Sequence, residues 1–435
     1  MKFLKNKILN SISIDRKIVV LLLVFECFIK NIPQINFSNI PIYIVCFISM
    51  LVLIKRFIFN RNIFFQRQNI FGYLFILSMI ITAILNNAVF NYNNLVLLVI
   101  HIIMFFIVTN FDDRENKDDV IHEFVIIARF VTALHFIYCI ASILYSLYIR
   151  DYEIKGLLGY SYFFSYNCVT VVGLSLFMLM YEKKNVIKFF YLFNLMIHLI
   201  TIFFTQARAS YLGIFIALIF IIYILMHNKI KWIDFELLKK YIFAFLFITI
   251  IITIVLSLIT EFSLFKVLSK VFTTKNILSW RDIIWDASLL AFLSGNIVFG
   301  ASIGGLPKFL SEFIDNVYIK NVSYNVYDKS AYNSALGIAK SGYLHNIFIQ
   351  QLCSYGIFGM LIMIAFIVDS IKEYIYIIKF KITNDKFLYL MICFSFTFIA
   401  QLVISFFDDN IFYNIVYICN VFFFYSIGLI SYLSK

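Results

Sequence analysis

Residues 187–227 read IKFFYLFNLMIHLITIFFTQARASYLGIFIALIFIIYILMH, two long apolar runs on either side of the short turn TQARAS. The runs cover 187–204 and 210–227. Each is close to the length of about 20 mainly apolar residues that an α-helix needs to cross a bilayer. The turn holds one charged residue, Arg208. This stretch therefore predicts two membrane-spanning helices joined by a tight connection, with an arginine at the membrane boundary.

The composition extends this prediction to the whole chain. Of the 435 residues, 63% are hydrophobic and 14% are charged, and three are proline. Soluble domains are nearer half apolar, with about a quarter of residues charged. We predict an all-α polytopic membrane protein with about twelve spans, at 18–32, 40–55, 70–87, 94–110, 124–148, 162–181, 187–204, 210–227, 241–259, 346–368, 387–406 and 411–432.

These spans divide the chain into three parts. We expect membrane helices within 1–259, one large loop over 260–345, and the last helices within 346–435. Inside the loop, apolar residues recur at spacings of three and four from Trp280 to Ala291, which predicts an amphipathic helix at the outer surface. A glycine-rich turn follows it, and the polar remainder to position 340 is expected to form a loop or lid.

Positive charge predicts the orientation of the chain. Lysine and arginine gather in alternate connections such as DDRENKDD and YEKKNVIK, and these should face the cytoplasm together with both termini. The short connections on the other side hold few of them, namely Lys30, Arg150, Lys155 and Arg208. The net charge of +12 is thus explained by membrane topology, and no nucleic-acid partner is expected. The seven cysteines lie in apolar runs without metal-ligand spacing, so neither a disulfide framework nor a metal site is expected.

Four polar groups fall on the outer side of the predicted membrane. Arginine binds phosphate bidentately, so Arg208 could hold an anion together with Ser210 at the start of the next helix; a snorkelling anchor is the simpler alternative. Arg281 could be a second phosphate ligand or part of a solvated helix face. Histidine titrates near neutral pH and can act as a general base. His345 with Asn346 is therefore the third candidate group. The fourth is the turn with Asp408 and Asp409, and by default we expect these two aspartates to be solvated.

The sequence contains none of several common enzyme motifs in a fitting structural context. We find no P-loop, Rossmann fingerprint, G-x-S-x-G, HExxH or DxD motif. This argues against an ATP-driven pump and against a metal-assisted nucleotide-sugar transferase.

Three stretches resemble, in order and spacing, the O-antigen ligase and polymerase superfamily of bacterial envelope proteins. TQARASYLG is similar to the family's Arg-containing turn before a span. WRDIIWDASLLAFLSGNIVFGASIGG is similar to its Arg-x-x-x-Trp helix and Phe-Gly-x-Gly turn, although the turn here is FGASIGG. HNIFIQQLCSYGIFG is similar to its His-Asn motif followed by Gly-x-x-Gly. The likeness covers roughly residues 200 to 430.

The resemblance implies a membrane glycosyltransferase (GT-C-like) architecture in the bacterial inner membrane, with the active site at the periplasmic face. It implies a glycan donor on undecaprenyl pyrophosphate and no metal or nucleotide cofactor. Arg208 and Arg281 would bind the pyrophosphate, and His345 would be the catalytic base or would position the acceptor. Ser210, Asn346, Asp408 and Asp409 complete the predicted substrate-binding set.

The leading interpretation is a polymerase of lipid-linked repeat units, for O-antigen or a similar surface polysaccharide. The alternatives are a ligase that transfers the glycan to lipid A core and, less favoured, a transporter of the same lipid-linked glycan. Transporters often contain internal repeats and Gly- or Pro-broken spans, and this sequence shows no such repeat. Membrane lipids are further expected partners, and a chain-length regulator protein stays open as another.

Overall fold

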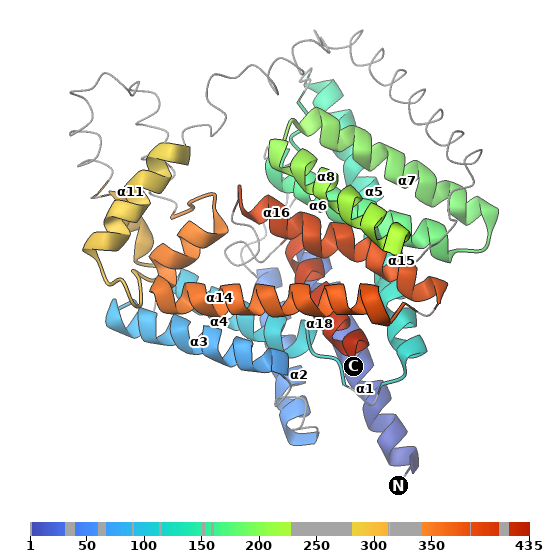
Figure 1. The fold of residues 1–435 in the computed structure, drawn as a ribbon, viewed down its shortest axis with the longest axis horizontal. Coiled ribbons are helices and arrows are strands. Elements are labelled where there is room, and N and C mark those ends of the chain that lie inside the picture. The colour runs from blue at the N-terminus through green and yellow to red at the C-terminus, as the bar shows by residue number, and fades with distance from the viewer. Residues whose placement is uncertain are drawn as a thin grey trace.

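The computed structural model of the protein describes residues 2–30, 40–59, 67–88, 91–112, 115–149, 153–157, 161–227, 281–311, 313, 337, 342–382, 384–408 and 417–435. All regular structure within these residues is helical (Figure 1). The helices are α1 Lys2–Lys30, α2 Ile40–Phe59, α3 Arg67–Leu85, α4 Tyr92–Ile103 with the π-helical η2 Met104–Val108, α5 Lys117–Tyr148, α6 Ser161–Tyr181, α7 Asn185–Thr205, α8 Arg208–His227, α11 Arg281–Ser294, α14 Ile347–Phe380, α15 Asp385–Phe394, the π-helical η4 Ser395–Ala400, α16 Gln401–Ser405 and α18 Ile418–Ser434.

The all-α membrane class is confirmed. Within the described ranges, seven helices are long and apolar enough to cross a bilayer, namely Pro41–Ile58, Lys117–Tyr148, Ser161–Tyr181, Asn185–Thr205, Arg208–His227, Ile347–Phe380 and Asp385–Ser405. Shorter apolar helices cover most of the predicted spans 70–87, 94–110 and 411–432, of which 411–416 lie outside the described residues, and α1 covers most of 18–32. The predicted span 241–259 lies outside the described residues, so the total of twelve stays a prediction.

Burial separates a central layer from a periphery. The percentage of buried residues in an 18-residue apolar stretch of each span shows this. It is highest for α6, at 78%, and for α15 to α16, at 83%, and it is only 22% for α8. The exposed residues of α8 are apolar and recur at helical spacing, for example Leu212, Phe215, Ile219 and Ile222. A soluble helix would carry polar residues there, so this stripe is the face expected to contact lipid.

Asparagine side chains fix where several helices begin. The Oδ1 atom of Asn116 accepts from the amide of Asp118 at 3.2 Å, and that of Asn384 accepts from the amide of Phe387 at 3.0 Å. Asn346 does the same for α14. Such caps satisfy amides that have no partner within the helix, which matters more in lipid than in water.

A buried ionic cluster joins α1, α5 and α18 on the side where the chain is expected to face the cytoplasm. The guanidinium of Arg16 donates to Glu123 at 2.7 Å and to Glu115 at 2.8 Å, and it lies 3.7 Å from the centre of the Phe111 ring. Tyr425 of α18 donates to the same glutamate, Glu123, at 3.1 Å. Because Arg16 is fully buried, these partners are what make its charge tolerable.

The helix α14 is bent, which corrects the sequence prediction of one continuous span with two glycines for close helix packing. Gly356 adopts φ 68° and ψ −168°, a backbone conformation that side chains other than glycine rarely adopt. Gly359 does face a neighbouring helix, since a Cβ there would lie 3.1 Å from Oγ of Ser78 in α3. The pattern of the two glycines did not distinguish a break from a packing contact.

The glycine-rich turn after α11 fills the break. The amides of Ile357 and Phe358 donate to the carbonyls of residues 297 and 298 at 3.0 and 3.2 Å. On the other side of the break, the carbonyls of residues 353 and 354 accept from the amides of Ala301 and Ser302 at 2.8 and 2.9 Å. Backbone groups at a helix break must find partners in a membrane protein. The turn supplies them, and it thereby fixes α11 against the first segment of α14.

The helix predicted within the loop is confirmed as α11, although it is apolar on its exposed face as well as on its buried one. Figure 1 shows it at the end of the bundle where α3 ends and α14 begins. Its residues Ile284, Ala287 and Ala291 are buried in a small core that also contains Leu344 and Cys353. The opposite face carries exposed leucines. Trp280, which contributed to the prediction, lies outside the described residues.

Candidate active site around Asp408

A buried carboxylate lies where four segments of the chain meet. Asp408 follows α16 and is 0% exposed. Tyr166 of α6 donates to its Oδ2 at 2.6 Å, and Tyr343 donates to its Oδ1. The expectation that Asp408 lies in a solvated turn is therefore wrong. The acidic residue instead forms the centre of a hydrogen-bonded cluster.

His345 is the third partner of Asp408. Its Nδ1 lies 3.1 Å from Oδ1 of the carboxylate, and its side chain is 15% exposed. A carboxylate accepts, so Nδ1 carries a proton, and in the neutral ring Nε2 presents a lone pair. The arrangement is the one in which an acidic residue selects the tautomer of a histidine base.

Arg281 brings a permanent positive charge to the same cluster. It is the first residue of α11, and its Nη2 lies 3.9 Å from Oδ2 of Asp408. At this distance the two groups form an ion pair but no hydrogen bond, so the guanidinium does not use its N–H donors on the carboxylate. Its side chain keeps 20% exposure, which leaves it accessible to an anion.

The environment of Asp408 favours its charged form. Burial alone raises the pKa of a carboxyl group, but the hydrogen bond and charge of His345, the charge of Arg281 and the Tyr166 hydroxyl outweigh it. The pKa of Asp408 is consequently lowered. The cluster therefore holds a carboxylate at neutral pH, ready to stabilise an imidazolium.

The backbone at His345 is held in an unusual conformation. Its φ is 53°, a left-handed value that costs a residue with a side chain about 1–2 kcal/mol. Asn346, the next residue, caps α14 through Oδ1, at 2.9 and 3.1 Å from the amides of Phe348 and Ile349. Its Nδ2 donates to the carbonyl of Phe406 at 2.9 Å. Asn346 therefore joins the start of α14 to the turn that carries Asp408.

Two more side chains hold the loop that leads to His345. Gln350 is buried, and it accepts from the amide of Leu344 at 2.9 Å and donates to the carbonyl of Gly342 at 3.0 Å. Trp285 of α11 donates from Nε1 to the carbonyl of Leu344 at 2.9 Å. The loop is thus attached to both α14 and α11, which fixes the histidine against Asp408.

The start of α8 lies beside this cluster. Ser210 is buried and accepts from Oγ of Ser165 at 2.7 Å. Ser165 precedes Tyr166, the residue that donates to Asp408. Arg208 is the first residue of α8 and is partly exposed. The serine that we predicted to bind substrate therefore joins α8 to α6, and the substrate-binding roles of Ser210 and Arg208 stay predictions.

The structure brings His345, Asn346, Arg281 and Asp408 together, while Asp409 lies outside the described residues. Sequence reasoning missed Tyr166, Tyr343 and Gln350, because nothing in the sequence reports which hydroxyl or amide reaches a distant loop. Trp285 had a signal, as one of three tryptophans in the chain, but it suggested a membrane interface only.

Ligand atoms that could hold a metal converge at one other place among the described residues. His135, Cys168 and His198 are all buried, with ligand atoms within 4.8 Å of one another. Nδ1 of His198 lies 2.7 Å from the carbonyl of Asn194 and so carries a proton, which leaves Nε2 to accept from Nδ1 of His135 at 2.8 Å. These bonds account for the pair as a packing element between α5 and α7.

Part of the chain matches a known protein family. Residues 192–364 match the model of a family described as O-antigen ligase. No curated protein matches the chain. The matched range contains Arg208, Arg281 and His345, and it ends before Asp408. The family supports O-antigen polymerase or ligase activity in general, and with it a glycosyltransferase-like enzyme that uses a lipid-linked glycan. The matched domain is consistent with the O-antigen polymerase and ligase superfamily.

Proposed function

We propose that the protein polymerises lipid-linked oligosaccharide repeat units at the periplasmic face of the bacterial inner membrane. The glycan would leave undecaprenyl pyrophosphate and join a hydroxyl of an acceptor sugar on the next lipid-linked unit. The observation that carries the proposal is the Asp408–His345 pair with Arg281 beside it. A base and a fixed cation at one boundary of a membrane bundle are what this transfer requires.

His345 would act on the acceptor. Its Nε2 accepts the proton of the attacking hydroxyl while the oxygen forms a bond to the anomeric carbon. The bond from that carbon to the phosphate oxygen breaks, and its electron pair leaves with the pyrophosphate. Asp408 stabilises the imidazolium that forms, because its pKa is lowered and it stays charged. Tyr343 and His345 both contact Oδ1 of Asp408. The hydrogen bond that Tyr343 donates therefore helps to position the carboxylate for the histidine.

The arginines would act on the leaving group. The pyrophosphate gains negative charge as the bond breaks, and fixed positive donors stabilise this charge in the transition state. Arg281 has N–H donors that do not reach Asp408 within hydrogen-bond distance. Arg208 would provide a second guanidinium from the first turn of α8, where helix amides also favour an anion. The activated donor carries the free energy for the reaction.

The orientation follows from charge. The connections richest in lysine and arginine would be cytoplasmic together with both termini, which places the His345 end of the bundle in the periplasm. A membrane-embedded donor with a polyprenyl tail could then present its pyrophosphate at the level of Arg208 and Arg281. A chain-length regulator would be a further partner of this polymerase.

A ligase that transfers the glycan to lipid A core is the second candidate, favoured by the description of the matched family. Purified protein supplied with lipid-linked repeat units alone separates the two. Products longer than one repeat unit support a polymerase. A glycan product that forms only after lipid A core is added would overturn the polymerase and support the ligase.

A further inference from the structure

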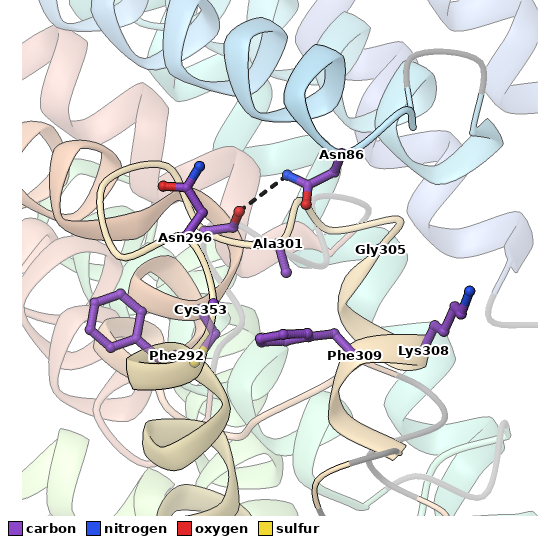
Figure 2. A pocket seen from close by; sticks show the side chains of 10 residues that line it. Asn86, Phe292, Asn296, Ala301, Gly305, Lys308, Phe309 and Cys353 are labelled. Atoms are coloured by element: carbon purple, nitrogen blue, oxygen red, sulfur yellow. Dashed lines mark hydrogen bonds between the residues drawn. The ribbon is translucent and has the colours of Figure 1, made fainter.

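A cavity of about 300 Å³ lies beside the glycine-rich turn, at the end of α11 remote from Arg281 (Figure 2). Four parts of the chain line it. Asn86 lies at the end of α3, Phe292 lies on α11, Cys353 lies on α14, and Phe309 lies on the helical segment 306–311. The volume is at the lower end of the range of about 300–1,000 Å³ for small-molecule sites.

The walls of the cavity combine aromatic rings with amides. Figure 2 shows Phe309 extending toward Cys353, opposite Phe292. Gly295, Gly300 and Gly305 contribute no side chains to fill the space. Among the described residues that line it, Lys308 is the only charged one. An isoprenoid tail would need a wholly apolar wall, and a cationic ligand would need an acidic one, so the lining fits neither.

Two amide groups have hydrogen-bonding capacity left at this cavity. Asn86 uses Nδ2 to donate to the carbonyls of Thr82 and Gly300, at 2.8 and 3.1 Å, and this leaves Oδ1 as an acceptor. Asn296 uses Oδ1 to accept from the amide of Phe299 at 3.1 Å, and this leaves Nδ2 as a donor. A donor and an acceptor at a cavity that aromatic rings also line suit a sugar, whose hydroxyls do both and whose C–H face packs on a ring.

The cavity is rigidly connected to the candidate active site. Cys353 lies eight positions after His345, almost all of them in α14, which corresponds to roughly 12 Å along the helix. Its carbonyl accepts from the amide of Ala301, another lining residue, at 2.8 Å. α11 carries Arg281 at its first turn and Phe292 near its last. An oligosaccharide that reacts at His345 can bridge this separation, whereas a single sugar cannot.

We propose that this cavity is a saccharide subsite, which holds a sugar of the glycan other than the one that reacts. The inference rests on the proposed function for its substrate. Phe292 and Phe309 pack on the sugar ring, and Asn86 and Asn296 hydrogen-bond its hydroxyls. Lys308 favours a neutral or anionic sugar over a cationic one. The subsite gives the enzyme a means to recognise a complete repeat unit before transfer.

The test compares substrates of two lengths. Phe309→Leu removes a ring face but keeps an apolar side chain, and Asn296→Asp keeps the Oδ1 acceptor but removes the free donor. Phe313→Leu is the matched control, because Phe313 pairs with Phe309 at a ring separation of 5.3 Å but does not line the cavity. Each full-length protein is assayed with a lipid-linked repeat unit and with a lipid-linked monosaccharide, each used in turn as acceptor and as donor.

We expect Phe309→Leu and Asn296→Asp to raise KM for the complete repeat unit about 3- to 10-fold, which is the effect of losing one hydrogen bond or packing contact. KM for the monosaccharide should stay unchanged. The role in which KM rises, acceptor or donor, identifies which glycan occupies the subsite. Equal KM values for wild type and both variants with the complete unit would overturn the inference. So would an equal rise for both substrate lengths.

A binding measurement separates this inference from the proposed function. The free repeat-unit oligosaccharide, without its lipid, is titrated into each protein by calorimetry. Weaker binding to Phe309→Leu than to Phe313→Leu supports the subsite, even if wild type transfers no glycan. The absence of transfer by wild type would overturn the proposed function alone. Transfer by wild type with no difference in binding between the two variants would overturn the subsite alone.

Discussion

His345 and Asp408 are 63 positions apart in the chain, yet Nδ1 of the histidine lies 3.1 Å from Oδ1 of the carboxylate. Asp408→Asn keeps the size of the side chain and removes the charge that would stabilise an imidazolium. We expect kcat to fall by between about 10²- and 10⁴-fold, the range that a positioned base contributes. Single-turnover assays with a lipid-linked repeat unit measure this. An unchanged kcat would remove Asp408 from the mechanism.

Replacing Arg208 or Arg281 with lysine should reduce activity. Arg208→Lys and Arg281→Lys keep a positive charge but lose the planar pair of donors that binds a pyrophosphate bidentately. We expect each to lower kcat by about 10²-fold or more, measured as the rate of polyprenyl pyrophosphate release. Arg129→Lys is the control, because Arg129 pairs with Glu182 away from the cluster, and its activity should stay close to that of wild type. Wild-type rates in the first two variants would contradict the assigned roles.

The break in α14 should be intolerant of a side chain. A Cβ on Gly356 would lie 2.2 Å from the carbonyl oxygen of Val298, and the φ of 68° is strained for alanine. Gly356→Ala should lower the free energy of unfolding by more than about 1 kcal/mol. Gly337→Ala is the matched control, since a Cβ there meets nothing within 4 Å. Thermal unfolding in detergent compares the two, and equal midpoints would show that the break can relax.

The buried ionic cluster of α1 should contribute to stability and not to substrate binding. Glu123→Gln leaves the fully buried Arg16 with one carboxylate, which should cost about 3–5 kcal/mol. Lys386→Gln removes the exposed pair with Asp118 and should cost about 1 kcal/mol or less. KM for the lipid-linked unit should be the same in both. A shifted KM in Glu123→Gln would indicate a functional role for the cluster.

The pH dependence of stability has a defined direction at Asp408. Because its pKa is lowered on folding, the carboxylate contributes stability at every pH above the unfolded value of about 3.9. That contribution is lost only as pH falls below 3.9 through the folded pKa. The difference in unfolding midpoint between wild type and Asp408→Asn should therefore still be present at about pH 5 and shrink below about pH 4. A difference that shrinks between pH 8 and 6 would contradict this assignment.

Much of the architecture follows from local patterns. Apolar length predicted the spans, and an apolar repeat predicted α11, because both depend on residues that are near in sequence. The hydrogen bonds at Asp408 were not predictable in this way. Tyr166 donates to it from 242 positions away, and whether such a residue is solvated or buried depends on how four segments meet. His345 was identified by its chemistry, while its partner was mistaken for a solvated turn.

The most direct test of the central claim uses purified wild type and His345→Ala, with Phe313→Leu as a folded control, and a radiolabelled lipid-linked repeat unit. The readouts are the glycan length and the polyprenyl pyrophosphate released. We predict that wild type and Phe313→Leu extend the glycan and release the carrier without added nucleotide. His345→Ala should still show a cooperative thermal unfolding transition in detergent and do neither. Glycan extension by His345→Ala at the wild-type rate would contradict the placement of the active site at the Asp408 cluster.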